Sequence, residues 1–344
     1  MHISIITGKR SIGLSRLVAA TMALTFVAMA AQAENGARPG LDDYLKRVGY
    51  LPVMLKRGEN DELLAEGVLA KKKRLFFVDT GWGQTALNKP AARGLKSIGE
   101  LDITLEDSFW GKLTDPSIVI MDKLTLGRAQ FFNQPASVRD LRMDFVGAQF
   151  DGVLGCDFLF RNYCLIDCLN RRLYVRGSIP SDDTTLAIEA TLRASGFKSV
   201  PMIWKHGLEV EAKVKNETFK LIVDTGGVFS MLDSALAKRL GLAAVKHDEA
   251  TLGSLMKKEL SANVIGVGTI GAHKMWVTTL QTLEVGSLQW TNVHVGVTDL
   301  KNWGLAAPGT ESEGVQGVVG RDALIARGAL IDYHSRMLWF RPQK

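Results

Sequence analysis

The chain has 344 residues, of which 46% are hydrophobic, and a formal net charge of +6 at pH 7. This length and composition suit one large or two medium-sized globular domains. Three of the basic residues lie in the first 33 positions, which hold no acidic residue, so the rest of the chain carries only about +3, a weak bias.

The N-terminal segment has the pattern of a secretory signal. Basic residues precede a mostly apolar stretch from Leu17 to Ala30, and Ala-Gln-Ala follows directly before Glu34. The apolar stretch is shorter than the about 20 residues that a membrane-spanning helix needs. We therefore expect residues 1–33 to be removed by a cut after Ala33, which predicts a secreted or periplasmic protein. The alternative is an uncleaved membrane anchor.

A basic run, "KKKR", occupies Lys71 to Arg74 between two segments rich in β-forming residues. In isolation it resembles a nucleic-acid-binding patch. Its place between two expected strands instead favours a solvated hairpin turn, and export argues the same way. No nucleic-acid partner is expected.

The chain has three cysteines, Cys156, Cys164 and Cys168, too few for a disulfide scaffold in an exported protein of this size. If "CLIDC" forms a strand, Cys164 and Cys168 lie about 13 Å apart, too far for a bond. Cys156 could pair with either of them, or all three could be small buried residues. The scattered histidines and the lack of metal-ligand spacings predict no metal site.

The chain contains an internal repeat with a long period. Asp-Thr-Gly ends an apolar run at Asp79 and again at Asp224, 145 residues later. Further along, Gly127 and Asn133 have counterparts 159 residues on, in the matching segments "LTLGRAQFFNQPASVRDL" and "LEVGSLQWTNVHVGVTDL". At an offset of 165, "DGVLGCDFL" matches "QGVVGRDAL" and "LIDCLNRRLYVR" matches "LIDYHSRMLWFR". This order indicates a tandem duplication, and the period is too long for a solenoid, so each copy is a lobe.

The repeat also sets the expected domain boundaries. A signal peptide, an N-terminal segment, a first lobe, a linker and a second lobe are predicted at 1–33, 34–48, 49–176, 177–195 and 196–344. Within the linker, "LAIEATLRASG" predicts a short helix that ends near Ser195 or Gly196. The apolar runs of both copies are short, β-branched and aromatic, and turn signals separate them. Each lobe is therefore predicted to be mainly β.

Two related lobes can meet at a pseudo-twofold axis, so that an aspartate from each faces its counterpart. Like charges a few ångström apart do not both ionise easily, so one carboxyl stays protonated. The ionised carboxylate can take a proton from a bound water while the neutral one donates to a carbonyl oxygen. The following Thr can hydrogen-bond across the lobes, and the following Gly keeps the turn tight. This pattern indicates hydrolysis of a peptide bond.

These motifs resemble those of the aspartic protease clan, which contains pepsins and retroviral proteases. The pattern of that clan, once per lobe, is two apolar residues and Asp-Thr-Gly, then a flap hairpin, then two apolar residues and Gly. It occurs here at Phe77 to Gly81 with Val153 to Gly155, and again in the second copy at Ile222 to Gly226 with Val318 to Gly320. The resemblance covers Gly49 to Arg341. It implies a bilobal, mainly β, pepsin-like acid protease fold, with two homologous six-stranded, retropepsin-like lobes in one exported bacterial chain.

The resemblance also implies roles for individual residues. Asp79 and Asp224 would be the catalytic pair of a monomeric endopeptidase that acts on peptides or proteins and needs no cofactor. The supporting residues would be Thr80, Gly81, Thr225 and Gly226, with Leu154, Gly155, Val319 and Gly320 from the apolar-Gly motifs packed beside them.

The residues after each Asp-Thr-Gly depart from the clan. Many members continue with Ala or Ser and then a small polar residue, whereas this chain has Trp82-Gly83 and Gly227-Val228. Trp82 would shape a pocket or pack between the lobes. The alternative function is therefore a catalytically inactive duplicate that binds peptides or a protein partner in the same place.

The segment "GVGTIGA", from Gly266 to Ala272, matches the GxGxxG/A pattern of dinucleotide loops. That assignment requires a helix directly afterwards. Here β-branched and aromatic residues follow, so we expect no nucleotide and instead a flap hairpin containing Gly268 and Gly271. The shorter counterpart in the first copy, "EDSFWGKLTD", offers Phe109 and Trp110 as candidate substrate contacts.

Overall fold

A computed structural model describes residues 40–58, 61–100, 104–107, 111–114, 117–139, 141, 150–205, 207–243, 267–268, 271–272, 276–300 and 314–342. The chain divides into two compact units, Met1–Tyr44 and Leu45–Lys344. Of the first unit the structure describes only Gly40 and the start of helix α2 (Leu41–Arg47). The expected signal at 1–33 lies outside the described residues. The description that follows concerns the second unit.

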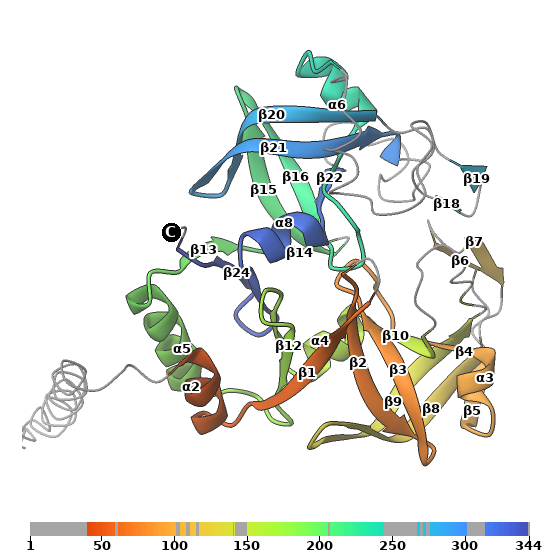
Figure 1. Cartoon of the computed structure of the whole chain (residues 1–344). Helices are drawn as coiled ribbons and strands as arrows, with labels where there is room; N and C mark the ends of the chain where they lie inside the picture. The colour runs from red at the N-terminus through yellow and green to blue at the C-terminus, as the bar shows by residue number, and fades with distance from the viewer. Residues whose placement is uncertain are drawn as a thin grey trace, which may run out of the picture. The chain divides into compact units, whose positions relative to one another are not determined.

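The first lobe contains a closed barrel of six strands (Figure 1). Its strands follow the order β2 (Leu63–Leu69), β3 (Lys72–Val78), β10 (Gly152–Leu154), β4 (Ala86–Asn88), β9 (Ala129–Arg139) and β8 (Ser117–Leu126). Pairing of β8 with β2 closes the ring, and β5 (Lys96–Glu100) lies beside β8. Inward-facing apolar side chains such as Phe76, Leu87 and Met121 fill the barrel.

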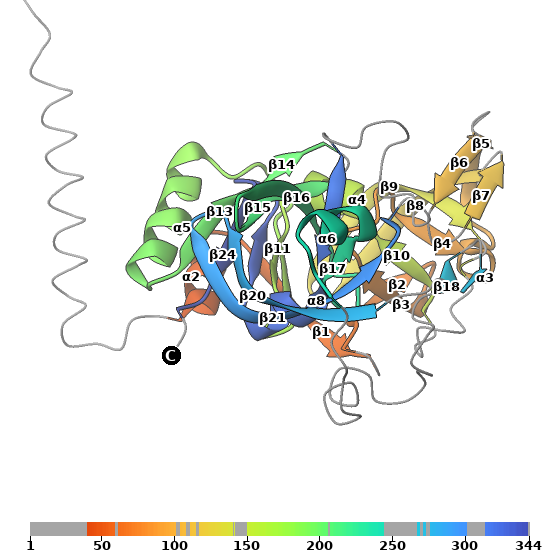
Figure 2. The same ribbon diagram turned by 90° about the horizontal axis from the view of Figure 1, so that it is seen from above.

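The second lobe repeats this barrel strand for strand. The order is β15 (Leu208–Val214), β16 (Glu217–Val223), β22 (Val315–Val319), β17 (Met231–Asp233), β21 (Leu288–Thr298) and β20 (Trp276–Val285), with β15 paired to β20. A short strand, β14 (Ile203–Trp204), lies beside β15. Figure 2 shows β20 and β21 as one long curved pair. The predicted mainly β, two-lobed fold is confirmed.

A six-stranded segment of sheet joins the lobes. Its order is β13 (Lys198–Pro201), β24 (Met337–Phe340), β23 (Leu330–Asp332), β11 (Leu165–Asp167), β12 (Arg172–Val175) and β1 (Leu51–Arg57). The two central strands, β11 and β23, are the repeats found at an offset of 165, and they pair antiparallel with Ile166 opposite Ile331. Equivalent strands that pair in this way put the pseudo-twofold axis between them, as the duplication predicted.

Backbone conformation repeats along with the topology. Gly127 and Gly286 each have a φ of 56°, in the left-handed region that favours glycine. Asn133 and Asn292 lie in the same region, with φ of 52° and 53°, and asparagine is one of the few residues that tolerates it. The matches at an offset of 159 therefore mark positions where both lobes adopt the same left-handed backbone conformation, in a turn at the glycines and within a strand at the asparagines.

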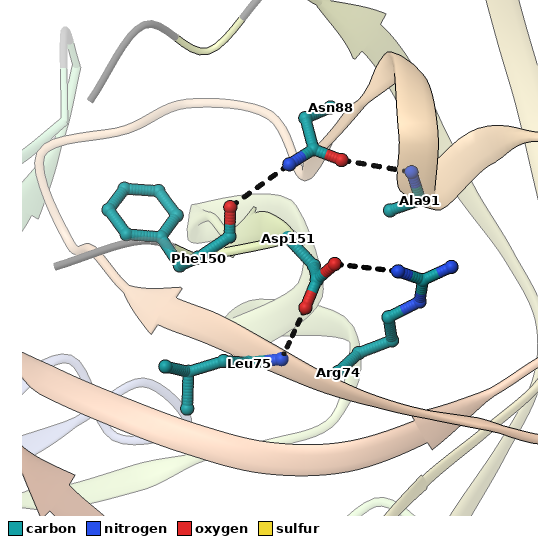
Figure 3. Close-up of polar contacts among 6 residues, drawn as sticks. All are labelled: Arg74, Leu75, Asn88, Ala91, Phe150 and Asp151. Atoms are coloured by element: carbon teal, nitrogen blue, oxygen red, sulfur yellow. Dashed lines mark hydrogen bonds and ion pairs between the residues drawn. The ribbon is translucent and has the colours of Figure 1, made fainter. Parts of the chain in front are cut away.

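The basic run lies where the hairpin was predicted. Ala70 and Lys71 have φ of 49° and 63° and turn the chain from β2 into β3, and the lysines are exposed. Arg74 points back to the barrel, where Nη1 donates to Oδ1 of Asp151 at 2.7 Å (Figure 3). The other carboxylate oxygen of Asp151 accepts from the N–H of Leu75 at 2.9 Å. Asp151 therefore links β3 to the chain directly before β10.

Short helices complete each lobe: α3 (Lys89–Ala92) and α4 (Cys156–Arg161) in the first, α6 (Ser234–Arg239) and α8 (Arg321–Ala326) in the second. Asn88 caps α3 by accepting from the N–H of Ala91, and its amide nitrogen donates to the carbonyl of Phe150 (Figure 3).

The linker helix is longer than predicted. Helix α5 (Asp182–Ala194) starts before the "LAIEATLRASG" segment, because Ser181 accepts from the N–H of Thr184 and caps it there. It ends at Ser195, as expected. The boundaries predicted for the domains themselves remain predictions.

All three cysteines are buried and free, so the interpretation as small core residues is confirmed over that of a disulfide. Within the described ranges, no helix combines the length and apolar character needed to cross a membrane.

Candidate active site

Asp79 and Asp224 each come directly after a barrel strand, β3 in the first lobe and β16 in the second. Each strand runs parallel to the strand that carries the apolar-Gly motif, with Val78 opposite Leu154 and Val223 opposite Val319. The N–H of Asp79 donates to the carbonyl of Leu154 at 3.2 Å, and the N–H of Asp224 donates to the carbonyl of Val319 at 3.0 Å. The ladder therefore continues to the aspartates and fixes where both side chains start.

Thr80 and Thr225 lock the two loops together across the lobes. The hydroxyl of Thr80 donates to the carbonyl of Val223 at 2.7 Å, and the hydroxyl of Thr225 donates to the carbonyl of Val78 at 2.8 Å. Each hydroxyl also accepts from the backbone N–H of the opposite threonine, at 2.9 and 3.0 Å. Both residues are fully buried. The cross-lobe hydrogen bonds expected from the sequence are present, two per hydroxyl.

Gly81 and Gly226 allow the two carboxylates to approach. A Cβ on Gly81 would lie 2.5 Å from Cγ of Asp224, and a Cβ on Gly226 would likewise overlap the carboxylate of Asp79. Each glycine thus lies against the aspartate of the other lobe. Each also donates its N–H to the aspartate of its own lobe, at 2.8 Å for Asp79 and 2.7 Å for Asp224.

The carboxylate of Asp79 is almost buried, with 8% of the residue exposed, while Asp224 is partly buried. Burial raises the pKa of Asp79 well above its ordinary value, and the nearby charge of Asp224 raises it further. The N–H of Gly81 and the guanidinium of Arg321 act in the opposite direction but are outweighed. Asp79 therefore keeps its proton to a higher pH than an ordinary carboxyl, which is the state expected for one member of a coupled pair.

The glycines of the apolar-Gly motifs pack against the aspartate loops. A Cβ on Gly155 would lie 2.7 Å from the carbonyl oxygen of Trp82, and one on Gly320 would lie 2.5 Å from that of Phe229. Neither site has room for a side chain. The predicted packing of these motifs beside the aspartate loops is present in both lobes.

Two supporting aspartates were not predicted. Oδ1 of Asp157 accepts from the hydroxyl and the N–H of Thr85, at 2.6 and 2.7 Å, and Oδ1 of Asp322 accepts from the hydroxyl of Ser230 at 3.0 Å. These hydroxyls in turn accept from the N–H groups of the glycines in the apolar-Gly motifs. Sequence carried a signal for them, because Gly-X-Asp recurs at an offset of 165.

Trp82 packs inside the first lobe, in a cluster with Phe77, Phe150 and Val153, and the guanidinium of Arg139 lies 5.1 Å from its ring centroid. The prediction that Trp82 packs between the lobes is therefore wrong, because the cluster that holds it lies wholly within the first lobe. At the equivalent position, Gly227 lies beside Asp224, whose Oδ2 would be 3.1 Å from an added Cβ.

The predicted flap residues are only partly described. Gly268 and Gly271 lie opposite each other in a small hairpin of β18 (Val267–Gly268) and β19 (Gly271–Ala272), and a strand rather than a helix follows at β20. In the first lobe, β6 (Thr104–Asp107) and β7 (Gly111–Thr114) form the corresponding hairpin. Phe109 and Trp110 lie outside the described residues. A flap role for these residues remains a prediction.

The fold and the paired Asp-Thr-Gly loops define the class of protein, a bilobal aspartic protease fold, and comparisons with known proteins agree. The profile of the family described as Aspartyl protease matches residues 210–323, which span Asp224 and the second apolar-Gly motif. The structure is similar to the aspartic proteinase from Irpex lacteus, with a TM-score of 0.51 and 14% sequence identity, over 86% of this chain and 98% of that one. No curated protein sequence matches the chain. The family match in the second lobe and the fold of the whole chain both support the aspartic protease clan.

Proposed function

We propose that this protein is an exported aspartic endopeptidase in which Asp79 and Asp224 activate a water molecule. The observation that carries the proposal is the reciprocal arrangement of the two Asp-Thr-Gly loops, in which each glycine lies against the carboxylate of the other lobe. Only close, paired carboxylates need that room, and a turn aspartate that merely caps a backbone group would not.

The reaction follows from a pair that shares one proton. The ionised carboxylate takes a proton from water, whose oxygen attacks the carbonyl carbon of the peptide bond, while the protonated carboxyl donates to the carbonyl oxygen. The tetrahedral intermediate then collapses as the amide nitrogen receives a proton and the C–N bond breaks, releasing an amine and a carboxylic acid. The threonine hydrogen bonds hold both carboxylates in place, so the pair needs little reorganisation during reaction.

The substrate in this proposal is an extended peptide held between the lobes, under the glycine-containing hairpins, by a monomeric enzyme. The alternative is an inactive duplicate that binds peptides at the same loops. Retention of both aspartates, both threonines and the two glycines favours catalysis. The altered residues after each Asp-Thr-Gly favour the alternative, but Trp82 points into the lobe and leaves Asp79 its partners.

The deciding experiment compares the purified protein with its Asp79→Asn and Asp224→Asn variants, each incubated with a diverse peptide mixture from acid to neutral pH. Mass spectrometry would read out the cleavage products. We expect cleavage by the wild type and none by either variant. Cleavage that survives either substitution would refute the pair as the catalytic group. Peptide binding without cleavage at any pH would establish the inactive duplicate instead.

The export proposal rests on the N-terminal pattern. N-terminal sequencing of the protein recovered from its native host should begin at Glu34. A protein that keeps Leu17 to Ala30 and sediments with membranes would instead be anchored.

A further inference from the structure

Equivalent residues after the two apolar-Gly motifs differ in charge. Cys156 and Arg321 lie 165 residues apart, each directly after the motif glycine. Sγ of Cys156 donates to the carbonyl of Thr80 at 3.0 Å, and Nη1 of Arg321 donates to the carbonyl of Thr225 at 2.6 Å. The same carbonyl of each Asp-Thr-Gly loop is therefore bonded by a thiol in the first lobe and by a guanidinium in the second.

Arg321 is a buried cation that reaches both lobes. It is 1% exposed, and its Nη1 also approaches the carbonyl of Gly226 at 3.4 Å. Its guanidinium lies 5.8 Å from the ring centroid of Phe77, in the strand that leads to Asp79. Burial lowers the pKa of Arg321, but arginine still keeps its charge at any physiological pH. The acidic groups that face it are Glu62, Asp224, Asp79 and Asp61, in decreasing order of interaction, together with Asp322 of its own helix.

The first-lobe counterpart is neutral. Burial raises the pKa of Cys156 to about 12, so the thiol stays protonated. Its sulfur also lies 3.4 Å from the hydroxyl of Tyr333, a buried phenol whose pKa is likewise raised well above its ordinary value. At these two equivalent positions, the second lobe therefore places a positive charge beside its Asp-Thr-Gly loop and the first lobe places a neutral thiol.

We propose that Arg321 is a positioning residue that polarises the carboxylate pair, because its charge lies against the loop that follows Asp224 while a thiol takes the equivalent place beside the loop that follows Asp79. This inference rests on the proposed hydrolytic function and assigns its two roles: Asp224 takes the proton from water, and Asp79 donates to the carbonyl oxygen. The hydrogen bonds of Arg321 go to the loop that follows Asp224, at the carbonyls of Thr225 and Gly226.

The negative charge of Glu62 offsets the positive charge of Arg321. Glu62 lies directly before β2 in the first lobe and is fully buried, and its charge opposes the lowering of the pKa of Arg321 by burial. A cation near the pair stabilises its ionised forms and lowers both titration steps, whereas a carboxylate that offsets the cation raises them. Removing the arginine and removing the glutamate charge should therefore move the pH range of the pair in opposite directions.

The test measures the pH dependence of kcat/KM for peptide cleavage in the wild type, Arg321→Met, Arg321→Lys and Glu62→Gln. NMR of labelled aspartate carboxyl carbons would follow the titration of Asp79 and Asp224 in the same proteins, whether or not they cleave peptides. We expect Arg321→Met to shift both limbs of the profile to higher pH by about one unit, and Glu62→Gln to shift them down by a similar amount. Arg321→Lys should keep the wild-type pH range even where kcat falls.

A loss of activity that is the same at every pH in Arg321→Met and Glu62→Gln, with unshifted carboxyl titrations, would overturn the inference. Arg321 would then have only a structural role. If Arg321→Met does not fold, the direction of the Glu62→Gln shift decides alone, because that variant keeps the arginine. Shifted titrations in a protein that cleaves nothing would refute the proposed hydrolysis while supporting the role of Arg321.

Discussion

The two Asp-Thr-Gly loops share the same backbone hydrogen bonds but differ in the side chains beside them. Hydrogen bonds that involve the backbone recur in both: those of the aspartate N–H groups, the glycine N–H groups and the reciprocal threonines. Side chains at the neighbouring positions have diverged, with Trp82 opposite Gly227 and Cys156 opposite Arg321. Contacts that set the position of the carboxylates constrain residue type strictly, whereas positions that touch them only through charge or packing are free to differ.

Substitution of either loop glycine, Gly81 or Gly226, should have the largest effect on cleavage. Gly81→Ala and Gly226→Ala would each push a methyl group into the carboxylate of the opposite lobe. A displacement of about 1 Å at a reacting group can cost about a hundredfold in rate, so we expect cleavage to fall by at least about that factor in both variants. Gly83→Ala is the matched control, since an added Cβ there meets nothing within 4 Å. Near-normal cleavage by Gly81→Ala would show that the carboxylates do not lie as described.

The reciprocal threonines should be energetically equivalent. Thr80→Val or Thr225→Val removes a hydroxyl that makes two buried hydrogen bonds, and leaves a carbonyl and an N–H without partners. We expect each to lower the free energy of unfolding by about 3 kcal/mol, measured by denaturant titration. The Thr→Ser variants keep the hydroxyl and should lose much less. Clearly unequal losses at the two positions would contradict the symmetry of the pair.

Asp79 should differ from an ordinary carboxyl in its effect on stability. Because the folded pKa of Asp79 is raised, its contribution to stability is present below the unfolded value of about 4 and is lost as the pH rises through the folded value. The wild type should therefore lose stability relative to Asp79→Asn across that window, by up to about 1.4 kcal/mol per pH unit. Urea unfolding of both proteins at several pH values would measure this. A difference that does not change with pH would mean that Asp79 ionises normally.

The smallest effect concerns the hydroxyls behind the loops. Thr85→Val and Ser230→Ala each remove a hydroxyl that donates to a supporting aspartate, Asp157 or Asp322, and accepts from the N–H of a motif glycine. We expect losses of about 2 kcal/mol in thermal or chemical unfolding. The exchanges Thr85→Ser and Ser230→Thr retain the hydroxyl and should be nearly neutral. A large effect of either exchange would show that the methyl group, rather than the hydroxyl, distinguishes the lobes.

Much of the site could be predicted because its parts are local in sequence. Asp79 and Asp224 end apolar strands, and their threonines and glycines follow directly, so one short motif carries most of the geometry. Helix α5 was predicted too short because the cap at Ser181 lies ahead of the apolar pattern. The recurring Gly-X-Asp pattern pointed to Asp157 and Asp322, but an aspartate in a short helix has many uses. Their hydrogen bonds to hydroxyls 70 or more residues away appear only in the structure.

The duplication, the strands and the loops that each lobe contributes could all be predicted from the amino-acid sequence, because they depend on local periodicity and on residues whose backbone requirements are strict. Three further features emerge from the packing of the folded chain: Trp82 packs inward, the three cysteines stay free, and Arg321 and Glu62 lie near the carboxylate pair. Those outcomes depend on which groups of one lobe meet the other, and charge interactions act through space rather than along the chain. The duplicated sequence thus predicts a symmetric pair of aspartates, and the packing around it makes that pair unequal.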